Sequence, residues 1–96
     1  MFINVLETIN FKNLRLLYLF NNILKNIDII AKAKFEKLEK LALDHNKISD
    51  INILEKVNFK ELNKLDLSNN EISDINILEK ANFKELKILD LSSNKI

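Results

Sequence analysis

A 24-residue repeat is the feature of this sequence that most constrains its fold. Residues 49–72 and 73–96 agree at 19 of 24 positions, and more diverged copies precede them. A unit this short cannot bury its own apolar side chains, so its copies must stack into an array. We therefore predict one repeat domain over residues 1–96, with a partial repeat at 1–13 and repeats that begin at residues 14, 38, 62 and 86, the last of which is incomplete.

Each repeat contains two hydrophobic periodicities. Residues 65–67 alternate apolar and polar side chains, which is typical of a short strand with one buried face. After the Ser-Asp pair at 49–50, the apolar residues Ile51, Leu54 and Val57 recur at helical spacing, which predicts a turn or two of helix with a side-chain N-cap. Parallel strands joined by such helices form right-handed crossovers. The predicted fold is an α/β solenoid with a short parallel sheet on its concave side and short helices on its convex side.

One motif recurs in every repeat. The pattern L-x-x-L-x-L-x-x-N-x-[IL] occurs as LRLLYLFNNIL, LEKLALDHNKI, LNKLDLSNNEI and LKILDLSSNKI. It resembles the leucine-rich repeat family over essentially the whole chain, and the continuation N-x-I-S-D-I resembles internalin-like and phosphatase-regulatory repeats. In such a unit the strand leucines point inward, and each motif asparagine binds backbone groups at a turn. We also expect four phenylalanines to stack as a spine on the outer side, namely Phe11, Phe35, Phe59 and Phe83.

The outward positions of the strands predict a surface that binds a partner. Equivalent residues of adjacent strands lie about 4.8 Å apart, so they line up in columns. We call the surface that these columns form the sheet face. Its first column contains Leu16, Lys40, Lys64 and Ile88; its second, Tyr18, Ala42, Asp66 and Asp90; its third, Phe20, Asp44, Ser68 and Ser92. We expect all of these residues except Ala42 to contact a protein partner.

Two clusters on the sheet face have two interpretations each. Leu16, Tyr18 and Phe20 form an exposed apolar cluster, which indicates either a partner site or a surface covered by a capping segment or a second copy of the chain. The aspartates of the face are placed to hold an arginine or lysine of a partner. Alternatively, they are solvated carboxylates that neighbouring lysines balance.

The composition gives no support for catalysis or for a bound cofactor. His45 is the only histidine, and no glycine is present to build a nucleophile elbow or a phosphate loop. Without cysteine there is no thiolate metal site, and the aspartates lack an ion-wrapping loop. Fifteen basic and 14 acidic residues are finely mixed, which does not favour nucleic acid. We predict a protein that is not an enzyme and that binds no cofactor, metal, nucleic acid or membrane.

The ends of the array suggest a second hypothesis. The chain begins within a repeat and stops at Ile96, just after its last predicted strand, so neither end has a capping repeat. An uncapped strand exposes backbone groups that favour pairing with another chain. The protein is then a self-assembling unit, or a piece of a longer array, that oligomerises through its ends. With no cysteine and no signal-like segment we expect a cytoplasmic protein, although a processed secreted form stays open.

Overall fold

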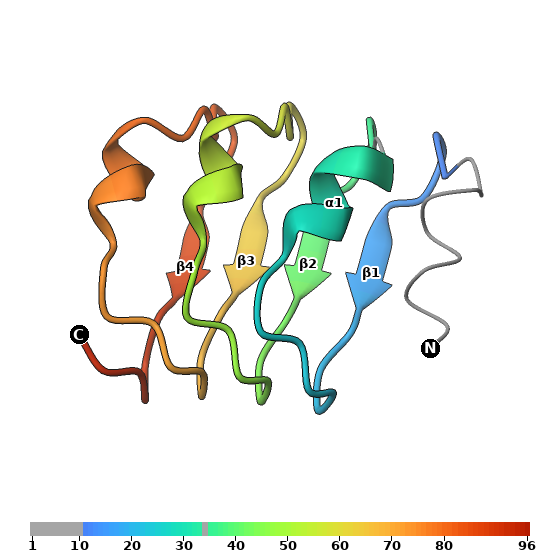
Figure 1. The fold of residues 1–96 in the computed structure, drawn as a ribbon. Helices are drawn as coiled ribbons and strands as arrows, with labels where there is room; N and C mark the ends of the chain where they lie inside the picture. The colour runs from blue at the N-terminus through green and yellow to red at the C-terminus, as the bar shows by residue number, and fades with distance from the viewer. Residues whose placement is uncertain (1–10, 34) are drawn as a thin grey trace.

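A computed structural model describes residues 11–33 and 35–96 as a coil of stacked repeats (Figure 1). The partial repeat predicted at residues 1–13 lies outside the described residues except for its last three. Strands and short helices alternate along the chain in the order β1 (Leu16–Tyr18), α1 (Asp28–Ala33), β2 (Lys40–Ala42), η2 (Asn52–Glu55), β3 (Lys64–Asp66), η3 (Asn76–Glu79) and β4 (Ile88–Asp90), where η denotes a 3-10 helix.

The four strands form one parallel sheet in chain order. The register of each pair is offset by one repeat, so that Leu17 lies beside Leu41, Leu41 beside Leu65 and Leu65 beside Leu89. The helical segments all pass over the same side of the sheet, and the chain coils in the right-handed sense (Figure 1). The predicted solenoid with a short parallel sheet is confirmed.

The core lies between the sheet and the helical segments. The core residues are almost completely buried; they include Leu41 and Leu65 of the strands, Leu67 just after β3, and Ile51 and Leu54 on the opposite side. Burying an aliphatic side chain of this size contributes about 1.5 to 3 kcal/mol relative to leaving it in water. Because each repeat supplies only one strand and one helical turn, this burial depends on both of its neighbours.

An asparagine ladder closes the turn after each strand, and it consists of Asn22, Asn46, Asn70 and Asn94. The amide nitrogen of Asn70 donates to the carbonyl of Leu67 in its own repeat and to that of Leu43 in the preceding repeat, both at 3.0 Å. Its Oδ1 accepts from the backbone N–H of Ile48 at 3.0 Å. These bonds confirm the predicted role of the motif asparagine and join each repeat to the one before it.

The residue before each ladder asparagine has a left-handed backbone. The four residues at this position are Asn21, His45, Asn69 and Ser93, with φ between 55° and 57°. Glycine usually occupies such positions because it has no Cβ to clash, and asparagine tolerates them best among the other residues. The chain thus builds the same turn four times without glycine.

The helical segments differ from the prediction at their starts. The N-cap of η2 is Ile51, whose side chain forms no capping bond. Asp50, which belongs to the predicted capping pair, accepts a hydrogen bond from the N–H of Asn52 at 2.8 Å, but it lies one residue before the observed N-cap. Asp74 does the same for Asn76 at 2.9 Å. The acidic side chain therefore tightens the turn into the helix, and does not occupy the cap position itself.

The first helical segment is also of a different type from the other two. Residues 31–33 of α1 read Ala-Lys-Ala, which are strong helix formers, and Asp28 and Lys32 complement the helix dipole at its two ends. In the next repeat the equivalent residues are Glu55, Lys56 and Val57, of which Val57 favours a helix less than Ala33 does. The helix there ends after four residues in the 3-10 form.

The phenylalanine spine is interrupted where these two types of repeat meet. Among the four described rings, Phe11 stacks on Phe35 at a centroid distance of 5.5 Å, and Phe59 stacks on Phe83 at 6.4 Å. Phe35 and Phe59 instead both line a groove of about 600 Å³ on the helical side. The expected continuous spine is therefore two stacked pairs. The break lies where the α-helical repeat of α1 meets the 3-10 repeat of η2.

Candidate partner-binding face

The apolar cluster predicted on the sheet face is exposed. Leu16, Tyr18 and Phe20 retain 50%, 55% and 55% of their accessible surface. Ile88 at the other edge of the sheet is exposed to a similar degree. Side chains of this size are seldom this open in adjacent positions of a small domain unless they form an interface.

Two lysines lie side by side in the first column. Lys40 and Lys64 are register partners on β2 and β3, and both are exposed. Neither forms a salt bridge with any residue in 11–33 or 35–96, whereas Arg15 pairs with Glu39 at 3.6 Å nearby. Like charges directly opposite each other on adjacent strands are destabilising. Lys40 and Lys64 therefore form a small positive cluster without a salt bridge in the described part of the chain, and the aspartates Asp66 and Asp90 lie in the neighbouring column.

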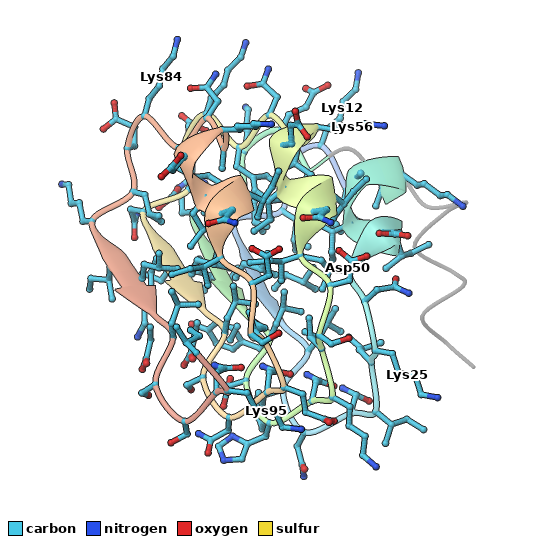
Figure 2. The ribbon with its side chains drawn as sticks, turned by 60° about the vertical axis from the view of Figure 1, so that its left-hand side comes forward. Lys12, Lys25, Asp50, Lys56, Lys84 and Lys95 are labelled. Atoms are coloured by element: carbon cyan, nitrogen blue, oxygen red, sulfur yellow. The ribbon has the colours of Figure 1, made fainter. Side chains whose placement is uncertain are left out.

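Other lysines of the chain lie away from this face. Figure 2 shows Lys56 and Lys84 at the end of the molecule where the chain turns from the helical side into the strands, and Lys25 and Lys95 toward the opposite end. Lys95 is paired with Glu71 at 3.3 Å. The positive charge of Lys40 and Lys64 is thus separate from these edge lysines.

Asp66 and Asp90 of the sheet face each accept hydrogen bonds from the serine two residues later in the chain. Oδ1 of Asp66 accepts from the hydroxyl of Ser68 at 2.7 Å and from its backbone N–H at 3.0 Å. Asp90 and Ser92 repeat this arrangement at 2.6 and 3.0 Å. The hydroxyl and the N–H of Ser92, and more weakly the charge of Lys64, hold the pKa of the Asp90 carboxyl below its ordinary value of 3.8.

This geometry gives the aspartates and serines a local structural role. Ser68 is buried, unlike the other predicted contact residues, and its hydroxyl is used by Asp66. Oδ2 of Asp44 lies 3.0 Å from Nδ1 of His45, within hydrogen-bond distance. One oxygen of each carboxylate is therefore engaged within the chain, which favours the second interpretation of this cluster over a dedicated cation grip.

A pocket that the sequence did not indicate lies between the aromatic residues and the lysines. It has a volume of about 200 Å³ and is lined by Tyr18, Phe20, Lys40, Leu41, Ala42, Lys64 and Asp66. Ala42 was the one column residue not expected to contact a partner. The signal that could have revealed the pocket is the size contrast along the second column, where Ala42 stands between Tyr18 and Asp66.

The described residues contain no other arrangement with evident chemistry. Within residues 11–33 and 35–96, no three histidine or acidic side chains gather closely enough to hold a metal ion. None of the helices in that part of the chain has the length and apolar character needed to cross a membrane.

Comparison with known proteins identifies the repeats. Residues 12–56 and 60–96 match the family described as leucine rich repeats (2 copies). No curated protein matches the chain. Repeats of this kind generally mediate protein–protein interaction and generally form a non-enzymatic fold. Because the match covers most of the chain and the strand register follows the repeats, the protein belongs to the leucine-rich repeat family.

Proposed function

We propose that this protein is a non-catalytic scaffold that binds a protein partner on its sheet face. The observation that carries the proposal is the adjacency of the exposed residues Leu16, Tyr18 and Phe20 to the lysine pair at 40 and 64. Interfaces combine large apolar side chains, which supply most of the binding energy, with charged groups around them, which supply orientation and specificity.

The backbone under this face favours binding without rearrangement. The strands are joined by parallel ladder bonds, and the asparagine ladder fixes the turn that follows each strand. Side chains on such a support lose little further conformational freedom when a partner binds, so less of the interaction energy is spent on ordering. The regular elements thus present the contact residues in a fixed arrangement.

A matched pair of charge reversals tests the proposal. The double variant K40E/K64E changes two lysines of the sheet face, and K56E/K80E makes the same change at two exposed lysines 24 residues apart on the helical side. Partners are captured from a cell extract with each immobilised protein and identified by mass spectrometry. We expect proteins that are held by the unmodified chain and by K56E/K80E but lost with K40E/K64E.

Circular dichroism of both variants checks that their folds are unchanged. If both variants retain the same proteins, or if only K56E/K80E loses them, the sheet face is not the binding surface and the proposal is wrong.

Self-assembly is the second candidate, and the last repeat favours it. Leu89 on β4 is 37% exposed, whereas its register partner Leu65 is completely buried. Leu91 and Phe83 are likewise more open than Leu67 and Phe59 of the preceding repeat. The edge of β4 and these side chains form a surface on which a repeat from a second copy can stack.

Light scattering after size exclusion tests self-assembly. We expect a dimer or larger species whose mass rises with protein concentration, and L89K should shift it to the monomer. A monomer at every concentration contradicts self-assembly and leaves the sheet-face proposal intact.

A further inference from the structure

The structure assigns a more specific role to the pocket at Ala42, and this inference rests on the proposed binding function of the sheet face. We infer that the pocket receives one aromatic side chain from an acidic segment of the partner protein, with a neighbouring carboxylate of that segment placed between Lys40 and Lys64.

The size of the pocket selects its occupant. Sites for drug-sized molecules have volumes of about 300 to 1,000 Å³, and this pocket has about 200 Å³. It is open to solvent on the sheet face, so a protein segment lying across the strands reaches it directly. Its volume suits a single large side chain of such a segment, inserted as an anchor.

The walls of the pocket select an aromatic group. Tyr18 and Phe20 stand on one side, both with about half of their surface exposed, and Ala42 leaves the space beside them unfilled. Aromatic rings pair favourably with one another in offset and edge-to-face arrangements, and each buries a large apolar area. An aromatic anchor therefore covers more of these two rings than an aliphatic one of the same length.

The charges around the pocket select an acidic neighbour for that anchor. Lys40 and Lys64 are adjacent in register and have no salt bridge with the described part of the chain. A carboxylate between them relieves their mutual repulsion and forms charge-assisted hydrogen bonds with both. Asp66 lies on the rim as well and carries a negative charge, but the bond from Ser68 fixes its Oδ1 and the two lysines outnumber it around the pocket. The lysine side of the pocket therefore remains the side that attracts an anion.

Alanine methyl groups provide a direct readout of the pocket. The chain contains four alanines, of which Ala42 lies in the pocket, whereas Ala31, Ala33 and Ala81 belong to the helical side. Protein labelled with carbon-13 at the alanine methyl groups is titrated with three blocked peptides, Gly-Glu-Phe-Glu-Gly, Gly-Lys-Phe-Lys-Gly and Gly-Glu-Ala-Glu-Gly. We expect the first peptide to shift the Ala42 signal in a saturable manner and to leave the other three signals in place.

The control peptides separate the two parts of the inference. Replacing the glutamates by lysines is expected to weaken binding about tenfold or more, since two attractions become repulsions. Replacing the phenylalanine by alanine removes the anchor and should weaken binding by a similar factor. The K40E/K64E protein should reverse the charge preference and bind the lysine peptide better.

The outcomes distinguish this inference from the proposed function. If the Ala42 signal does not move, or if the three peptides move it equally, the inference is wrong. If the K40E/K64E protein nevertheless loses captured proteins that K56E/K80E keeps, the sheet face binds a partner of different chemistry and the proposed function stands. If both results are negative, the proposed function fails together with the inference.

Discussion

The asparagine ladder and the first column of the sheet face follow the same 24-residue spacing, but the ladder keeps one residue type and the column does not. The ladder repeats one residue in every unit, and Asn70 satisfies its amide entirely with backbone groups of its own and the preceding repeat. The first column of the sheet face changes from Leu16 to Lys40, Lys64 and Ile88, and its two charges have no salt bridge with the described residues.

The difference shows which demands the fold makes at each position. Every turn leaves the same backbone N–H and C=O groups without a partner, so the same asparagine side chain can form hydrogen bonds with them in each repeat. The outward positions of the strands place no such demand on a side chain, because solvent can satisfy any polar group there. Residues at those positions are free to serve a partner, even where they disfavour the fold slightly.

Removing a ladder asparagine is the largest expected effect. In N70A the N–H of Ile48 loses its partner in the interior, whereas the carbonyls of Leu43 and Leu67 each lose one donor and keep another, from Asn46 and Asn94. A buried polar group left without a partner costs about 1 to 3 kcal/mol, so we expect the free energy of unfolding to fall by about that amount. Urea denaturation measures this change.

N94A is the matched control, because Asn94 makes the same kinds of bond at a more exposed position. Its loss should be distinctly smaller, since water replaces part of the missing bonds. Equal losses, or a loss below about 1 kcal/mol in N70A, would contradict the role given to the ladder.

A single charge reversal in the first column of the sheet face should raise the free energy of unfolding. K40E replaces two like charges on adjacent strands by an opposite pair with Lys64. Cross-strand pairs of this kind change stability by about 0.2 to 1 kcal/mol, so K40E is expected to be slightly more stable than the unmodified chain. The same urea experiment measures it, with K56E as the control on the helical side. A clear loss of stability in K40E would mean that Lys40 supports the fold.

The smallest expected effect concerns the Asp90 carboxyl. Its pKa lies below 3.8, chiefly because Ser92 donates to it from the hydroxyl and the backbone N–H. A lowered pKa in the folded state favours folding above pH 3.8, and this contribution disappears as the pH falls through the folded-state pKa. S92A should move the pKa back toward 3.8, as measured by NMR titration of the carboxyl carbon. An unchanged titration would assign the lowered pKa to the backbone N–H of residue 92 and to Lys64 instead.

The parts of the fold that repeat were predictable from the sequence. The strand centres, the parallel arrangement and the role of the ladder asparagines follow from residues that recur at a fixed spacing, because identical units in contact must adopt equivalent positions. The exposure of Leu16, Tyr18 and Phe20 followed from the alternation of the strand.

The parts that depend on differences between repeats were not predictable in this way. Whether a helical segment forms an α-helix, as α1 does, or a 3-10 helix, as η2 does, depends on the helix propensities of a few residues. These differ by fractions of a kcal/mol per residue. The pocket at Ala42 depends on the sizes of side chains from three strands at once. Ser68 is buried although the alternation of the strand predicts an outward position, and Ser92 makes the same bond to its aspartate but is exposed, so the burial of Ser68 depends on the neighbouring repeats.

The bonds that Asn46, Asn70 and Asn94 make to the preceding repeat also determine how such a chain can change its length. Losing or gaining a single residue between two ladder positions separates Asn70 from the carbonyl of Leu43 and shifts every later strand out of register. Duplicating a whole 24-residue segment keeps all of these bonds and adds one strand with three new outward positions. Growth by whole repeats therefore enlarges the sheet face by one strand at a time, while the core of each added repeat makes the same contacts as the existing repeats.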